Sequence, residues 1–199
     1  NSARAEECRF MHAYCYYLDS PRSTLDQANT KKAIDALQLF VNLYPESERS
    51  KEAADLIQKL RDKLELKAFA NARLYYDMGL TDDYRAAVIA LQNVLKEYPD
   101  TKYAEEIEFL TLKAQYIYAS KSFFLKQESR FDDALDYYRS FASNFPNSKH
   151  MKEAESLREN SEKGIKTALS QVKDYNKAVA EQEVYIKEQK AKKEKENTQ

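Results

Sequence analysis

Glycine and proline are scarce in this sequence, which contains two glycines and four prolines among its 199 residues. A β-rich fold would need many more residues of these two types, because tight hairpin turns depend on them. Alanine, leucine, lysine and glutamate are abundant instead, and 33% of the residues are charged. This composition predicts an all-α protein with a large solvated surface.

Net charge is also lacking, since 32 basic residues stand against 33 acidic residues and leave a net charge of −1. The chain therefore has no overall field that would draw it onto nucleic acid or anionic lipid. No run of 18 or more apolar residues occurs, so no segment is a candidate membrane-spanning helix. We expect a soluble chain without a nucleic-acid partner.

Cysteine and histidine occur only twice each. Cys8 and Cys15 lie seven positions apart in a helical pattern, which separates them by roughly 10 Å and excludes a disulfide between them. A thiol nucleophile or a metal site would need a nearby histidine, and the sequence offers only His12 and His150. We therefore expect both cysteines to be buried apolar side chains.

The common motifs for nucleotide, metal or cofactor binding, such as a glycine-rich phosphate loop, HExxH or CxxC, do not occur. Carboxylates are scattered along the predicted helix exteriors, as at Glu105 and Glu106, which is typical of solvated faces. We predict no catalytic residue, no metal ligand and no cofactor, so the protein is not expected to be an enzyme. An enzyme with an unrecognised site remains the least favoured hypothesis, after the two protein-binding roles that are described below.

One pattern occurs three times, in residues 33–53, 87–107 and 134–154. In each copy a small residue is followed four and seven positions later by larger apolar residues, which places all three on one helix face. A proline stands twelve positions after the small residue, and helices tend to end before such a residue. A serine or threonine two positions further on is a natural N-cap for the next helix. The repeat-signature residues are Ala33, Pro45, Ala87, Pro99, Ala134 and Pro146, with caps at Ser47, Thr101 and Ser148.

This order of helix, stop, cap and helix is typical of tetratricopeptide-like hairpins. The intervals between successive repeat prolines are 54 and 47 residues, longer than the roughly 34 residues of a standard unit, so we expect long helices or loops. The predicted fold is a stack of helical hairpins in a right-handed superhelix, an α-solenoid.

Three segments are expected along the chain: a repeat array over 1–163, a helical extension over 164–186 with a break at Gly164, and a charged, disordered tail over 187–199. Asn1 and Ser2 fit the register that follows a repeat proline, so we expect the array to be truncated on its N-terminal side. The predicted helices cover residues 2–18, 30–43, 47–78, 84–97, 101–126 and 131–144, and a last helix starts near 148.

Tyrosine is unusually frequent, with 15 copies. Most should pack between crossing helices, but some could form a protein-binding face. The loop over residues 19–27 is longer than a repeat connection needs, so it could be either an ordered connector or a contact surface. The candidate partner-binding residues are Arg73, Tyr75, Tyr76, Tyr84 and Arg85.

Residues 67–101 resemble the D subunit of the bacterial β-barrel assembly machinery, an outer-membrane lipoprotein made of tetratricopeptide-like repeats. The similarity extends over roughly residues 2–163. It rests on Lys67, Ala72-Arg73-Leu74-Tyr75-Tyr76, Gly79, Tyr84, Ala86-Ala87-Val88 and Tyr98-Pro99-Asp100-Thr101, and further back on Phe10-Met11, Ser20-Pro21-Arg22 and Leu25-Asp26-Gln27.

The resemblance implies a non-catalytic adaptor at the periplasmic face of the outer membrane, held there by a lipid anchor that this fragment lacks. Its implied partners are the periplasmic domain of the barrel-forming subunit and unfolded outer-membrane proteins, which it helps to insert. The alternative is a generic tetratricopeptide co-chaperone that captures peptide tails. Lys67 and Asn71 could begin a carboxylate clamp of that kind, although the sequence shows no equivalent pair after them.

Overall fold

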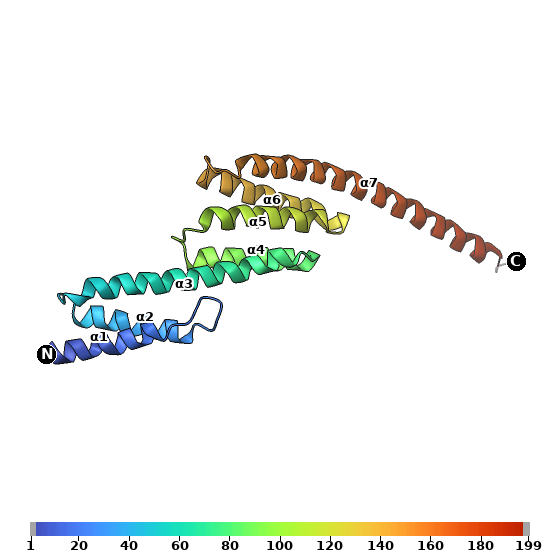
Figure 1. Ribbon diagram of the computed structural model, residues 1–199. Helices are drawn as coiled ribbons and strands as arrows, with labels where there is room; N and C mark the ends of the chain where they lie inside the picture. The colour runs from blue at the N-terminus through green and yellow to red at the C-terminus, as the bar shows by residue number, and fades with distance from the viewer. Residues whose placement is uncertain (1–2, 197–199) are drawn as a thin grey trace. The chain divides into compact units, whose positions relative to one another are not determined.

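The computed structural model describes residues 3–196, which form seven α-helices and no β-strand (Figure 1). This confirms the predicted all-α repeat fold. The helices are α1 (Ala3–Leu18), α2 (Ala28–Leu43), α3 (Arg49–Met78), α4 (Thr81–Glu97), α5 (Ala104–Ser120), α6 (Phe124–Asn144) and α7 (Met151–Glu196).

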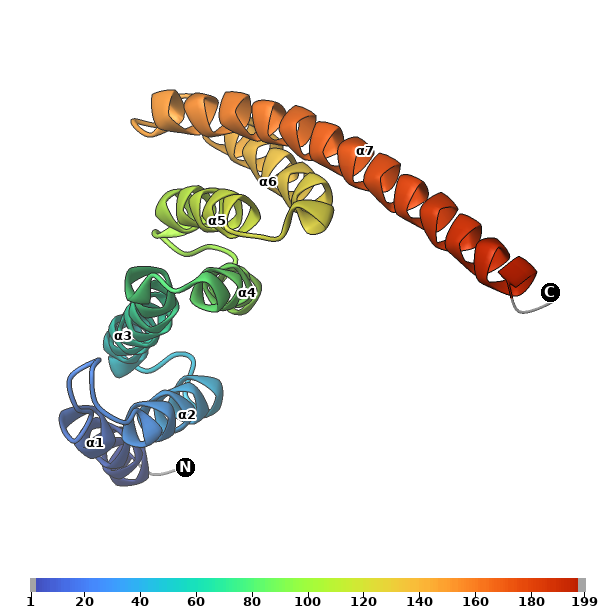
Figure 2. The same ribbon diagram turned by 90° about the vertical axis from the view of Figure 1, so that its right-hand side faces the viewer.

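The chain divides into two compact units, and α3 and α4 each contribute residues to both. The first unit comprises residues 1–74 and 93–101, and the second comprises 75–92 and 102–199. In the first unit α1 and α2 lie side by side as a hairpin (Figures 1 and 2). Their shared core, which includes the start of α3, consists of Phe10, Ala13, Ala33, Leu37, Phe40, Ala53, Leu56, Ile57 and Leu60.

In the second unit α6 packs against both α5 and α7, and α7 extends well beyond the N-terminal end of α6 (Figures 1 and 2). A smaller apolar cluster joins Ala87 and Val88 of α4 to Ala114 of α5. The main core of this unit consists of Phe109, Leu112, Ala134, Phe141, Ala154 and Leu157.

The signature alanines and prolines have different roles. Ala33, Ala87 and Ala134 are completely buried, whereas the three signature prolines are exposed in the turns. The aromatic residue before each proline closes the helix, because its backbone N–H donates to the carbonyl four residues earlier at 2.8–2.9 Å. The hydroxyls of Ser47 and Ser148 accept N–H bonds from the second residue after them, as expected of caps.

The predicted boundary between the fifth and sixth helices was wrong. The sequence indicated helices over 101–126 and 131–144, but α5 ends at Ser120 and α6 begins at Phe124. The Gln127 side chain donates to the carbonyls of Ser120 and Ser122 at 3.1 and 3.0 Å, and Arg130 donates to the Ser122 hydroxyl. Side chains of α6 therefore hold this turn, which contains neither glycine nor proline.

Gly164 does not break the last helix, contrary to expectation, because α7 continues through it. A Cβ at this position would lie 2.5 Å from Cε2 of Phe131, so glycine allows the Phe131 ring to approach the helix backbone. The expected boundaries at 163/164 and 186/187 both fall inside α7. The helix also continues over 187–196, where composition predicts disorder, because the lysines, glutamates and alanine there are good helix formers.

The expectation that the cysteines are buried was wrong, since Cys8 and Cys15 are both exposed. Phe10 and Ala13 form the buried face of α1, and the two cysteines lie on other sides of the helix. Residues 1–2 and 197–199, which bear on the expected N-terminal truncation and the expected tail, lie outside the described part of the chain.

Candidate protein-binding surfaces

The turn between α3 and α4 presents large apolar side chains to solvent. Tyr75, Met78 and Leu80 are 43%, 52% and 69% exposed. Gly79 between them has a φ of +78°, a left-handed conformation that glycine adopts readily. We call Tyr75, Met78, Leu80, Tyr84 and Arg85 the α3–α4 turn surface, all of it within the second unit.

Two of the predicted partner-binding tyrosines mainly support this surface. The rings of Tyr76 and Tyr84 meet edge to face with their centroids 5.7 Å apart, and both pack on the cluster of Ala87, Val88 and Ala114. Burial raises the pKa of Tyr76, and the nearby ammonium of Lys113 opposes this effect. Tyr76 is therefore half-buried against this cluster.

Lys121, directly after α5, stabilises the turn through two contacts. Its ammonium lies 4.8 Å from the centroid of the Tyr84 ring and donates to the Gly79 carbonyl at 3.3 Å. Sequence reasoning missed Lys121, Met78 and Leu80. Met78 and Leu80 could have been found, because they flank a glycine that marks a turn. The contact of Lys121 with this turn could not be predicted without the fold.

The two predicted arginines belong to different units. Arg85 is exposed on α4 beside the turn, in the second unit. Arg73 is exposed on α3 but belongs to the first unit. Of the five predicted residues, the structure places Tyr75, Tyr84 and Arg85 on the turn surface.

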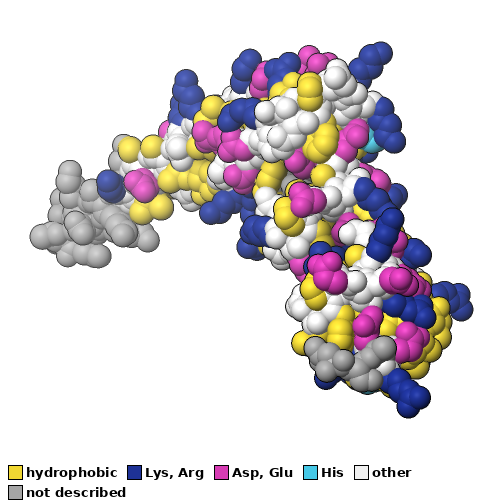
Figure 3. Space-filling view, turned by 90° about the vertical axis from the view of Figure 1, so that its left-hand side faces the viewer, with side chains coloured by type: hydrophobic (Ala, Val, Ile, Leu, Met, Phe, Trp, Pro, Cys, Tyr) yellow, Lys and Arg dark blue, Asp and Glu magenta, His cyan; other side chains and the backbone are white. Residues whose placement is uncertain are grey.

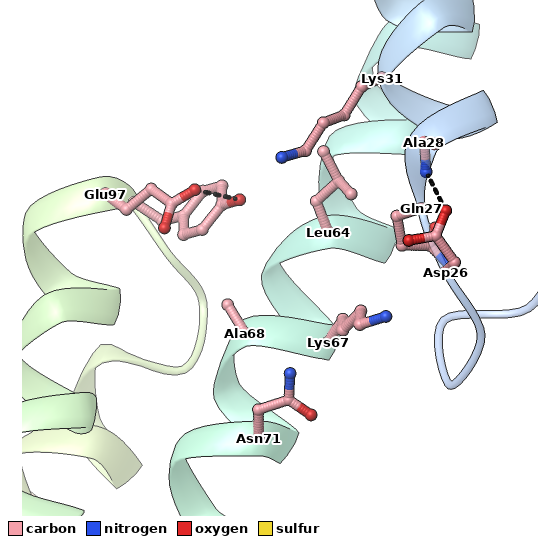
Figure 4. A pocket seen from close by; sticks show the side chains of 10 residues that line it. Asp26, Gln27, Ala28, Lys31, Leu64, Lys67, Ala68, Asn71 and Glu97 are labelled. Atoms are coloured by element: carbon pink, nitrogen blue, oxygen red, sulfur yellow. Dashed lines mark hydrogen bonds between the residues drawn. The ribbon is translucent and has the colours of Figure 1, made fainter. Parts of the chain in front are cut away.

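The first unit contains a groove along the middle of α3 (Figure 4). The groove consists of two neighbouring hollows with volumes of about 430 Å³ and 530 Å³. Leu64, Glu97 and Tyr98 line both of them. The first is also lined by Asp26, Gln27, Ala28, Lys31, Lys67, Ala68 and Asn71, and the second by Ile34, Gln58, Arg61, Glu65, Pro99, Asp100 and Thr101.

Two of the carboxylates that line this groove accept hydrogen bonds from within the chain. The Asp26 carboxylate accepts from the backbone N–H of Ala28 at 2.9 Å, and Glu97 accepts from the Tyr98 hydroxyl at 3.0 Å. Burial, together with Glu97, raises the pKa of Tyr98 to about 12. Lys31 is exposed at the groove edge, as Figure 4 shows. The groove therefore combines an apolar floor of Leu64 and Tyr98 with exposed basic groups at Lys31 and Arg61. Four carboxylates also line it, those of Asp26, Glu65, Glu97 and Asp100.

The loop over residues 19–27 is an ordered connector that also borders this groove. Lys63 donates to the Ser20 hydroxyl at 2.7 Å, and Ser20 and Thr30 share a 2.6 Å hydrogen bond. Thr30 donates to the Gln27 side-chain oxygen at 2.7 Å, so Ser20 must be the donor to Thr30. The Gln27 amide in turn donates to the carbonyls of Arg22 and Leu25.

Surface charge is mixed on the face shown in Figure 3, where acidic and basic side chains alternate without a large area of either sign. No helix in residues 3–196 has an apolar stretch long enough to cross a membrane.

Comparison with known proteins connects these surfaces to a family. The chain is similar to outer membrane protein assembly factor BamD of Caulobacter vibrioides, with 29% identity over 110 residues. This match covers 55% of the chain and 35% of the relative, so the chain spans about a third of that relative's length. A tetratricopeptide-repeat family model matches residues 114–148. Because the family model described as YfiO, outer membrane lipoprotein, matches residues 1–120, more than half of the sequence, the chain belongs to the YfiO family of outer membrane lipoproteins.

Proposed function

We propose that this protein is a non-catalytic adaptor of the outer-membrane protein assembly machinery. Its main partner would be the periplasmic domain of the barrel-forming subunit, and its place would be the periplasmic face of the outer membrane, reached through a lipid anchor. Membership of an outer membrane lipoprotein family and similarity to an assembly factor support the role. We assign the contact with this partner to the α3–α4 turn surface, because its large apolar side chains are exposed.

This turn has the features of an interaction surface. Exposed Leu80, Met78 and Tyr75 offer apolar area to a partner, while Lys121 and the tyrosine pair hold the turn in one conformation. A preorganised surface loses little conformational entropy on binding. Arg85 at its edge supplies a charged group of the type that is enriched among strongly contributing interface residues.

The test is calorimetric titration of the purified periplasmic domain into the wild-type chain and its variants. We expect Leu80→Ala and Arg85→Ala each to weaken binding by about 2 kcal/mol, roughly thirtyfold. Leu18→Ala is the matched control, because Leu18 at the end of α1 is 66% exposed, close to the 69% of Leu80. Equal effects of the two leucine substitutions would refute the surface assignment, and no binding by wild type would refute the adaptor role.

A second function, capture of unfolded outer-membrane proteins, is favoured by the groove along α3. An extended peptide could place apolar side chains on Leu64 and Tyr98 and its carboxylates near Lys31 and Arg61. This site would also suit the alternative role of a generic peptide-binding co-chaperone. The two roles differ in the first experiment, since a generic co-chaperone would not bind the barrel subunit's domain.

Fluorescence anisotropy with a labelled peptide from a strand of an outer-membrane protein tests the groove. Lys31→Glu should weaken binding at least fivefold, because it reverses a charge at the groove edge. Lys32→Glu is the control, since Lys32 is an exposed neighbour outside the residues lining the groove. If both variants lose affinity equally, the peptide responds to net charge and not to the groove.

A further inference from the structure

A single line of mostly small or apolar residues runs along α7 for most of its length. At 100° per residue, its members fall within a sector about 100° wide, one face of the helix. They are Ala154, Leu157, Ser161, Gly164, Ala168, Val172, Tyr175, Val179, Gln182 and Ile186.

The first half of this stripe is covered by α6. Ala154, Ser161 and Ala168 are completely buried and Leu157 is 8% exposed. The ring of Phe131 lies directly against Gly164. This half shows what the stripe accommodates, namely a helix that carries aromatic side chains.

The cover ends where α6 begins. Phe124, the first residue of α6, meets Tyr175 with ring centroids 5.6 Å apart, and its neighbour Phe123 is 63% exposed. Beyond Tyr175 the stripe continues through Val179 to Ile186, which is 44% exposed. The established interface thus continues into a second half, residues 172–186, which α6 covers only at its start, through the contact of Phe124 with Tyr175.

We propose that residues 172–186 of α7 bind one amphipathic helix of a partner protein, laid antiparallel to α7 and in line with α6. The orientation follows from the covered half, where Phe131 contacts Gly164 and the earlier Phe124 contacts the later Tyr175. Residues 172–186 span about four helical turns, roughly 22 Å, of which the part beyond Tyr175 is about three turns, roughly 16 Å. The occupant would place its apolar residues at the i, i+3, i+4 and i+7 positions.

A second copy of α7 fits less well than a short partner helix. In an antiparallel pair centred on Val179, residues 187–196 of each copy would run onto the part of the stripe that α6 already covers. In a parallel pair the contact would continue over 187–196, where Ala191 is the only apolar residue. Either pairing leaves only about two heptads of contact, which is short for a stable coiled coil.

The experiment uses the full chain and a fluorescein-labelled designed peptide of about 18 residues, with leucines at the helical spacing and alternating Lys and Glu elsewhere. Anisotropy should show micromolar binding to wild type and at least tenfold weaker binding to Val179→Glu. Val184→Glu is the matched control, because Val184 is 55% exposed on another face of the same helix. It should change the affinity less than twofold, and circular dichroism should show that both variants retain the wild-type helix content.

Three outcomes would overturn the proposal. Failure of wild type to bind the peptide at about 100 μM, or equal losses in the two valine variants, would show that the stripe is not a helix-docking surface. Sedimentation velocity that shows a dimer dissolved by Val179→Glu would assign the stripe to a second copy of this chain. None of these results depends on the α3–α4 turn surface, so they are independent of the proposed adaptor role.

Discussion

Two hairpins of this molecule share one arrangement. One consists of α1 and α2, the other of α5 and α6, and the start of the following helix packs against each. Phe10 meets Phe40 in the first, and Phe109 meets Phe141 in the second, with ring centroids 5.4 and 5.8 Å apart. The next helix adds a further group over the first ring of each pair. Arg49 lies 4.7 Å from the Phe10 centroid, and His150 stacks on Phe109 at 4.3 Å.

Ten residues before Phe40 and Phe141, about three helical turns away, the two arrangements differ. Thr30 in the first hairpin occupies the place of Phe131 in the second, and Lys63 in α3 occupies the place of Gly164 in α7. The first hairpin fills this layer with the hydrogen-bond chain from Lys63 to Gln27. The second fills it with an aromatic ring against a bare helix backbone. The same repeat frame therefore tolerates either a polar or an apolar layer, provided both helices change together.

The largest predicted effect tests the part that the two hairpins share. Phe40→Ala and Phe141→Ala should each lower the free energy of unfolding by about 3–5 kcal/mol, because both rings are almost completely buried and leave cavities. Urea denaturation followed by circular dichroism measures the loss. Leu43→Ala, at an exposed position of α2, is the control and should cost under about 1 kcal/mol. A small loss for only one phenylalanine variant would show that the two cores are not equivalent.

The next effect tests the layer where they differ. Gly164→Ala should destabilise the chain by about 1–3 kcal/mol, because the new methyl group would overlap the Phe131 ring. In a Phe131→Leu background the same change should become neutral or stabilising by up to about 1 kcal/mol, since alanine favours helix over glycine. Thermal melts of the four variants in this cycle measure the coupling. Destabilisation of equal size in both backgrounds would show that the ring is not the cause.

The shared features could be predicted from the sequence, and the differing ones could not. The spacing from Ala33 to Pro45, repeated twice, predicts helices, their ends and their buried alanines, because these depend on local periodicity and on proline stereochemistry. The turn at residues 121–123 was missed because side chains of α6 hold it and no glycine or proline marks it. The role of Gly164 depends on a ring from another helix, which no local pattern reveals.

The candidate surfaces were only partly predictable for the same reason. Tyr75, Tyr84 and Arg85 lie where the tyrosine cluster indicated, but periodicity alone cannot distinguish an exposed tyrosine from Tyr76, which is half-buried. The groove along α3 joins residues from α2, α3 and the end of α4. Such a site forms only when the helices pack, so the sequence indicated just its first members, Lys67 and Asn71.

A smaller effect compares the two connections, since each is held by one glutamine that donates to two backbone carbonyls. Gln27→Ala should cost about 1–2 kcal/mol, because Gln27 is buried and its loss removes the acceptor of the Thr30 hydroxyl and one of the donors to each of two backbone carbonyls. Gln127→Ala should cost less, about 0.5–1 kcal/mol, since water can replace its bonds at the less buried turn. Urea denaturation of both variants measures the difference, and the reverse order would contradict this view of the two connections.

The smallest effect concerns the second copy of the repeat pattern, where Tyr98 occupies the position of Tyr44 and Phe145. Burial raises the pKa of Tyr98 to about 12 from its ordinary value of 10.0. The folded state therefore holds this proton more tightly than the unfolded state does. Its contribution to stability is complete below about pH 10 and is lost as pH rises through about 12.

Tyr98→Phe should remove this component, so the variant should lose less stability than wild type over that range. Tyrosinate absorbance, taken as wild type minus variant under native conditions, should show a transition near pH 12. A transition near pH 10 would mean that Tyr98 is solvated, and the apolar floor assigned to the groove would then lose one of its two main residues.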